Sequence, residues 1–173
     1  MDLYKETIRI ETQGDRTTYV DITKKVNEII KESNIKEGLC VVMSPHTTCS
    51  VFFEEFSHDI NDKGDEFLQT DLNNILGKII PSHDCADTYH YPGEKHYQAV
   101  ESWPNTEDYL PDGDRSALWN GDGHLKATLI GSSQTFDVTE NKLGLGSTGY
   151  IYFADFDQTR SRTRKAQITI IGK

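Results

Sequence analysis

Apolar and polar residues alternate with a period of two along much of this chain, as is typical of strands with one buried face. Residues 4–12 alternate in this way and residues 17–22 follow after a Gly14-Asp15 turn, so the pattern predicts a hairpin. Two apolar runs of strand length, residues 39–43 and 51–53, lie on either side of a polar turn. The last third of the chain contains further strand-like stretches at residues 124–130, 134–138, 149–156 and 166–171.

Two other stretches repeat apolar residues at helical spacing. The first starts at Asp21 or Thr23, residue types that can cap a helix, and places Val26, Ile29 and Ile30 on one face. The second ends at about residue 79 and carries a longer apolar stripe, which we assign to the core. The stripe consists of Phe67, Leu68, Leu72, Ile75, Leu76 and Ile79. These helices and short strands predict an α+β class with an antiparallel sheet or barrel.

The length of 173 residues fits a single domain, residues 1–173, with one long inserted loop at about residues 81–123. That loop holds both tryptophans, Trp103 and Trp119, and a disordered segment would be poor in aromatic residues. We therefore expect an ordered loop that packs on the domain or across a subunit boundary.

Charge and cysteine content narrow the possible partners and the compartment. The net charge of −10 argues against nucleic acid or an anionic membrane as the partner. No apolar run reaches the roughly 18 residues of a membrane span. The three cysteines are odd in number and form no CxxC pair, so we expect free thiols and a cytoplasmic location.

Histidines follow or open several predicted strands. His46 lies in the turn after residues 39–43, His124 opens a later predicted strand, and the long loop carries His90 and His96. We predict that His46, His124 and one of the two loop histidines meet at one edge of the sheet. Three imidazoles there would hold zinc or another divalent metal, with one open coordination position. The alternatives are a turn in which His46 caps backbone groups, and histidines scattered over the surface.

Two further groups of polar residues suit an anionic substrate. Asp122, His124 and Lys126 alternate onto one side of the predicted strand and could bind a phosphorylated or carboxylated molecule; a solvated strand face is the alternative. Arg160 and Arg162, two of three arginines at a spacing of two, could bind phosphate in a bidentate manner. They could equally form surface ion pairs with the nearby aspartates.

Taken in order, these motifs resemble the YjbQ family, the secondary thiamine-phosphate synthase proteins, over nearly the whole chain. The resemblance implies an α+β fold in which a mixed, largely antiparallel sheet closes toward a barrel with two helices. It also implies a homotrimer with sites near subunit boundaries, and a weak activity that makes thiamine phosphate. The motifs are PHTT at residues 45–48 with Glu54 beyond, GHLKATLIGSS at 123–133, LGLG at 143–146 and FADFDQTRSRTR at 153–164.

By position, the resemblance implies His46, Glu54, His124 and Lys126 as catalytic residues. The candidate metal ligands are the histidines named above, His46, His124, His96 and His90, and no organic cofactor is evident. The candidates for binding substrate are Thr47, Thr48, Asp122, Ser147, Arg160 and Arg162. One departure lies at residues 146–149, which read Gly-Ser-Thr-Gly where family members commonly carry Gly-Thr-Trp-Gln. Another is the long loop, which replaces a short Tyr-x-His loop.

Two classes of function follow from these candidates. The first is an enzyme that acts on a small phosphorylated substrate through histidine acid–base chemistry, with or without a metal. If it makes thiamine phosphate, a pyrimidine pyrophosphate loses pyrophosphate to a thiazole phosphate, and cationic groups stabilise the departing charge. The second is a trimer that binds a metal or ligand without turnover.

Overall fold

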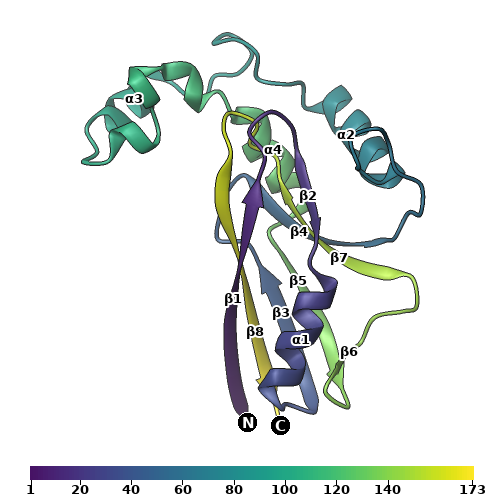
Figure 1. Ribbon diagram of the computed structural model, residues 1–173. Coiled ribbons are helices and arrows are strands. Elements are labelled where there is room, and N and C mark those ends of the chain that lie inside the picture. The colour runs from purple at the N-terminus through teal and green to yellow at the C-terminus, as the bar shows by residue number, and fades with distance from the viewer.

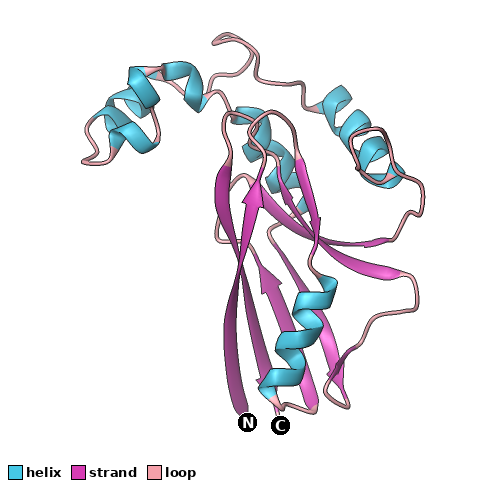
Figure 2. Ribbon diagram, viewed as in Figure 1, coloured by secondary structure: helices cyan, strands magenta, loops and turns pink.

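The computed structural model describes all 173 residues and has an antiparallel sheet that curls into a half-barrel, with four α-helices (Figures 1 and 2). The larger sheet has the strand order β1 (Asp2–Thr12), β8 (Arg162–Gly172), β3 (Glu37–Met43), β5 (Ser133–Thr139) and β6 (Lys142–Leu143). The smaller has the order β2 (Thr18–Asp21), β7 (Gly149–Asp155) and β4 (Cys49–Glu55). The α+β class is confirmed, although every strand pair is antiparallel and the sheet is not mixed.

The main core lies between the two sheets and helix α1 (Thr23–Ser33), in the part of the molecule that we call the sheet body. It contains 17 buried residues, among them Val26, Ile29 and Ile30 of α1, as the helical spacing predicted. Cys40 and Cys49 are buried there as free thiols. The two chain termini lie side by side at the lower end of this body (Figure 1).

The predicted hairpin between residues 4–12 and 17–22 is wrong. Strand β1 pairs with β8, where Ile8 lies opposite Ala166, and β2 pairs with β7, where Val20 lies opposite Phe153. The Gly14 turn therefore carries the chain from one sheet to the other. A Cβ on Gly14 would lie 2.3 Å from the Ser161 backbone nitrogen, so only glycine fits this crossing.

The strand predicted at residues 124–130 is part of a helix, α4 (Gly121–Ile130). Asp122 and Lys126 are one helical turn apart and form a buried ion pair of 2.7 Å, so they do not share a strand face with His124. A Cβ on Gly123 would lie 3.1 Å from the carbonyl of Phe156, which shows how closely this helix approaches the end of β7. Polar and small residues thus form the buried side of α4, and no apolar stripe marks it as a helix.

The core assignment of the second helical stripe is also wrong for most of its members. Helix α2 (Phe67–Ile79) buries Leu76 and packs Leu72 against a small cluster around Phe52 and Tyr152. The helix lies beside the upper end of the smaller sheet (Figure 1). The four remaining apolar residues of the stripe are exposed: Phe67, Leu68, Ile75 and Ile79.

The long loop is ordered, as its aromatic content predicted. It contains α3 (Glu94–Glu101) and three short 3₁₀ segments, Thr106–Asp108, Pro111–Gly113 and Arg115–Leu118. Its buried apolar residues are Val100, Leu110 and Leu118. Helix α3 projects on the side of the molecule opposite α2 (Figure 1). No helix in the chain has the length and apolar character needed to cross a membrane.

Candidate functional site

Two connections between strands meet at the upper end of the sheets. One is the loop from β3 to β4, which carries His46, and the other is the turn from β7 to β8. The Phe156 backbone nitrogen donates a 3.0 Å hydrogen bond to the Thr48 carbonyl, and the Lys165 backbone nitrogen donates one of 3.0 Å to His46 Nε2. These bonds place the predicted histidine and threonines beside the predicted arginines.

A fully buried carboxylate, Asp155 at the end of β7, fixes the base of this site. Arg164 Nε lies 2.7 Å from Asp155 Oδ2, and Arg164 Nη2 lies 3.1 Å from Oδ1. The hydroxyls of Thr12 and Thr48 also donate to this carboxylate, at 2.9 and 3.4 Å. A bidentate pair with these additional bonds holds the Arg164 guanidinium in one orientation.

Asp157 pairs with the second arginine of the turn. Its Oδ2 lies 2.7 Å from Arg162 Nη1 and accepts a 2.8 Å hydrogen bond from Asn120 Nδ2. Its Oδ1 accepts hydrogen bonds from the backbone nitrogen and hydroxyl of Thr159. Burial alone would raise the pKa of Asp157, but Arg162, Thr159 and Asn120 hold it below its ordinary value. The carboxylate is therefore ionised and neutralises Arg162.

The third arginine, Arg160, forms no ion pair with a carboxylate. Its Nη1 donates a 2.9 Å hydrogen bond to the Tyr109 carbonyl, and its guanidinium lies 5.9 Å from the centre of the Tyr109 ring. Burial and the positive charges of Arg162 and Arg164 lower the pKa of Arg160. A partly buried guanidinium without a carboxylate partner is a suitable group for binding an anion.

Asp157 and the three arginines line a cavity of about 310 Å³, which we call the arginine cavity. Asn120 lines it as well, and its buried Oδ1 accepts no hydrogen bond from the protein. The walls combine charged, polar and aromatic side chains, a composition that suits a small ligand with one anionic group. The cavity is lined by Pro45, His46, Thr47, Thr48, Tyr91, His96, Val100, Trp103, Tyr109, Leu118, Asn120, His124, Asp157, Arg160, Arg162 and Arg164.

Three of the four predicted metal-binding histidines reach this cavity: His46, His96 and His124. Burial lowers the pKa of His46 and of His124, and Arg164 acts in the same direction on both. Both rings are therefore neutral at pH 7. Because His46 Nε2 accepts the Lys165 hydrogen bond, its proton lies on Nδ1.

This arrangement does not fit a bound metal. No group of three or more His, Cys, Asp or Glu side chains in the chain is placed to hold a metal ion. One ring nitrogen of His46 is occupied by a backbone donor, and His96 Nε2 lies 3.3 Å from the Tyr91 hydroxyl. Arg160, the one of the three guanidinium groups without a carboxylate partner, also repels a cation. The structure therefore gives the predicted zinc centre no support.

Five predicted residues do not line the arginine cavity: Glu54, Ser147, Lys126, Asp122 and His90. Glu54 lies at the other end of β4, opposite Tyr150, and Ser147 precedes the corresponding end of β7. Burial and Glu66 raise the pKa of Glu54. Lys126 is held in its ion pair with Asp122, which lines a different cavity. His90 lines a separate hollow together with His124 and Leu125.

Sequence reasoning considered ion pairs between the arginines and the nearby aspartates at the surface, but it did not select Arg164, Asp155 or Asp157 as site residues. Their spacing contained the signal, because Asp155 and Asp157 precede a tight turn and Arg162 and Arg164 follow it. Arg162 pairs with Asp157 and Arg164 pairs with Asp155 across this connection, although β7 and β8 lie in different sheets. The pairs do form, but they are buried rather than on the surface.

The fold and the site define an α+β protein with a half-barrel sheet and an arginine-lined cavity at one end. The family model described as UPF0047 protein YjbQ-like matches residues 6–173, so the chain belongs to the YjbQ family. The protein MJ1081 of Methanocaldococcus jannaschii is 31% identical over 157 residues, covering 91% of this chain and 87% of that protein. YugU of Bacillus subtilis is 26% identical over 158 residues, covering 91% and 93%.

Solved structures agree with this assignment. A YbjQ-like protein of unknown function from Sulfolobus solfataricus has a TM-score of 0.66 and 23% identity, covering 99% of this chain and 100% of that one. A YjbQ/UPF0047 family protein from Clostridium acetobutylicum has a TM-score of 0.64 and 27% identity, covering 95% and 99%. The fold is therefore that of the family along almost the entire chain.

Proposed function

We propose that the protein binds a small phosphorylated substrate in the arginine cavity and acts on it through His46 and His124. Arg160 carries the proposal, because it is a partly buried guanidinium without a carboxylate partner beside two arginines that have one. A phosphate there would pair with Arg160 and relieve the repulsion from its neighbours. The unpartnered Asn120 Oδ1 adds an acceptor for a hydroxyl or a protonated phosphate oxygen of the ligand.

The resemblance to secondary thiamine-phosphate synthases supports a particular reaction class. In that reaction a nitrogen nucleophile attacks a carbon, the bond from this carbon to oxygen breaks, and pyrophosphate leaves. Fixed guanidinium groups would stabilise the negative charge on the departing oxygen. The neutral ring of His124 would transfer protons to or from the reacting groups, and His46, whose Nε2 accepts the Lys165 hydrogen bond, would donate a hydrogen bond from Nδ1.

A second candidate is a ligand-binding protein without turnover. It is favoured by one observation: Glu54 and Lys126, which the resemblance assigned to catalysis, do not line the arginine cavity. For either candidate, the three unpaired cysteines fit a reducing cytoplasm.

Calorimetric titration with inorganic pyrophosphate tests the binding. Arg160→Gln should weaken affinity about tenfold or more, because a hydrogen bond to a charged group contributes roughly 1.5–3 kcal/mol. Arg9→Gln is the matched control, because Arg9 is exposed and forms no ion pair. Equal affinity in both variants would refute the proposal. Release of pyrophosphate from a pyrimidine pyrophosphate in the presence of a thiazole phosphate would then separate the enzyme from the binding protein.

We also propose a homotrimer, as the family resemblance implies. Its support is the apolar side of α2, where Phe67, Leu68, Ile75 and Ile79 are exposed in a single chain. A second copy would cover these side chains. Light scattering should give the mass of three 19.6 kDa chains, and Ile75→Glu should lower it whereas Lys31→Glu, at an exposed position of α1, should not. A monomer in the unmodified protein would overturn this proposal.

A further inference from the structure

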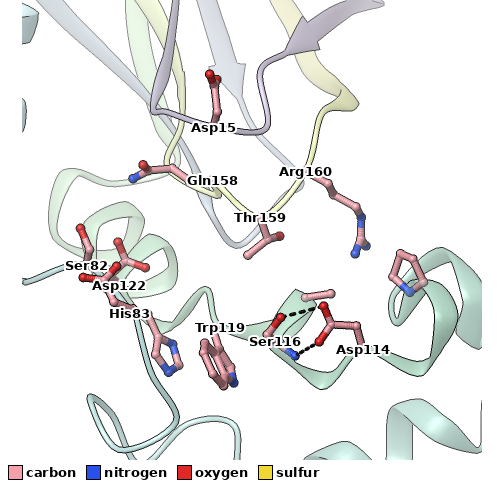
Figure 3. A pocket seen from close by; sticks show the side chains of 13 residues that line it. Asp15, Ser82, His83, Asp114, Ser116, Trp119, Asp122, Gln158, Thr159 and Arg160 are labelled. Carbon is pink, nitrogen blue, oxygen red and sulfur yellow. Dashed lines mark hydrogen bonds between the residues drawn. The ribbon is translucent and has the colours of Figure 1, made fainter.

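A second and larger cavity, of about 510 Å³, adjoins the arginine cavity and shares Arg160 with it. We call it the acidic cavity. Figure 3 shows it between the turn that carries Gln158 and Thr159 and the loop residues His83 and Trp119. The function proposed above makes no use of this space, although its size is within the range of ligand pockets.

The charge of the acidic cavity is opposite to that of its neighbour. Asp15, Asp84, Asp114 and Asp122 line it, with Arg160 as the one Lys or Arg side chain. Asp122 is paired with Lys126, and Asp114 accepts hydrogen bonds from Ser116, whereas Asp15 and Asp84 form no ion pair. The lining therefore favours a ligand that presents N–H donors.

His83 supplies an independent indication of a ligand. The side chain is 6% exposed, and its Nδ1 accepts a 3.1 Å hydrogen bond from the Gly121 backbone nitrogen. In the neutral ring the proton therefore lies on Nε2, which is buried and has no hydrogen-bond partner. Burial lowers the pKa of His83, whereas Asp122, Asp84 and the Cys85 backbone act to raise it. The Cys85 carbonyl does not satisfy Nε2, which has no hydrogen-bond partner. A buried donor of this kind requires an acceptor.

The walls around His83 are flat and aromatic. Its ring lies nearly parallel to Trp119, at an interplanar angle of 18° with the centres 6.0 Å apart, and meets the edge of Tyr89. A Cβ at Gly121 would lie 3.3 Å from His83 Nδ1, so the absence of a side chain there lets the ring sit close to the helix. Aromatic surfaces of this type stack on planar ligands.

We propose that the acidic cavity binds a planar heteroaromatic ring that carries an amino group. The amino group would donate to the free carboxylates, a ring nitrogen or carbonyl would accept from His83 Nε2, and the ring would pack against Trp119. Because Arg160 lines both cavities, one ligand can place such a ring here and a phosphate in the arginine cavity. This bridging part rests on the proposed function, whereas the ring site does not.

Three compounds test the two parts of this proposal separately. Adenosine carries the ring, ribose 5-phosphate carries the phosphate, and AMP carries both. In a Trp103→Phe variant the remaining tryptophan, Trp119, lines the acidic cavity, so adenosine should quench its fluorescence. By calorimetry AMP should bind at least about tenfold more tightly than either fragment, because the second contact becomes intramolecular. AMP binding no tighter than adenosine would overturn the bridge, and absent binding of ribose 5-phosphate would overturn the proposed function alone.

Variants test the role of His83 directly. His83→Phe keeps a flat ring without the donor and should weaken adenosine about fivefold, as for a neutral hydrogen bond, with ribose 5-phosphate unchanged. His58→Phe, at an exposed histidine, is the control. If His83→Phe does not fold, Asp84→Asn at an exposed position should weaken adenosine about threefold. No quenching of Trp119 by adenosine, or unchanged adenosine affinity in the variant tested, would overturn the ring site.

Discussion

The sheet body is stabilised by different interactions from the long loop, whose residues 81–120 precede α4. The body has one core of 17 buried apolar residues contributed by α1 and both sheets. The loop buries only Val100, Leu110 and Leu118 as a separate cluster and is otherwise tied by polar contacts, such as the Asn120–Asp157 hydrogen bond. The arginine cavity lies where the two regions meet. Its charged groups lie on β8 and on the connection from β7 to β8, and its aromatic wall comes mainly from the less densely packed loop.

This difference separates two roles. The body provides the stability and holds Asp155, Asp157 and their arginines in place, whereas the loop provides Trp103, Tyr109 and Trp119 for contact with a ligand. Charged groups need a rigid support, because a small displacement removes most of their effect. An apolar wall with few buried contacts can adapt to different ligands.

The largest expected effect comes from breaking the buried ion pair in the body. Arg164→Met leaves the fully buried Asp155 without its partner, which should lower the free energy of unfolding by about 3–5 kcal/mol. Denaturant titration measures this loss. Lys165→Met, at the next and exposed position of β8, should change stability by less than about 0.5 kcal/mol. A loss below about 1 kcal/mol for Arg164→Met would mean that the pair does not anchor the site.

The next effect compares one core residue from each region. Ile30→Ala removes a fully buried side chain of the body and should cost about 2–5 kcal/mol of global stability. Leu110→Ala should act locally and raise amide hydrogen exchange in α3 and the neighbouring 3₁₀ segments about tenfold, with β3 and β8 unaffected. If both variants lower the unfolding midpoint equally, the body and the loop unfold as one unit and the separation is wrong.

The same difference decides what the sequence could predict. In the body, alternation and helical spacing identified α1 and most strands, because each element buries one regular apolar face. The partners of β1 and β2 could not be predicted in this way, because each strand forms its hydrogen-bond ladder with a strand far along the chain. Helix α4 was missed because its buried side consists of Gly121, Asp122, Gly123, Lys126 and Ala127. The i, i+4 spacing of Asp122 and Lys126 was the available signal.

At the site, residue types were predicted better than their positions. His46, His124, His96, Arg160 and Arg162 do line one cavity, since each lies at or near the end of an element or in the loop above it. Glu54 and Lys126 do not, because strand direction and the α4 helix carry them elsewhere. Periodicity identified the apolar side of α2, but it does not reveal whether the same chain covers that side.

The smallest expected effect is the response to pH, which involves one histidine of the long loop, His83, and two outside it, His46 and His124. Burial lowers the pKa of His46, His124 and His83 below the ordinary value near 6.5, so the folded state binds fewer protons than the unfolded chain. This stabilisation is fully present above pH 6.5 and is lost as the pH falls through the lowered values. The melting temperature should therefore fall between about pH 7.5 and 5.5.

Pyrophosphate should oppose that loss, because protonated His46 and His124 add positive charge to the arginine cavity and bind an anion more tightly. The rise in melting temperature caused by pyrophosphate should thus be larger at pH 5.5 than at pH 7.5. His124→Asn should reduce this difference, whereas His58→Asn, at an exposed histidine, should leave it unchanged. An equal rise at both pH values would show that His46 and His124 do not face the bound anion, and would assign its binding to the arginines alone.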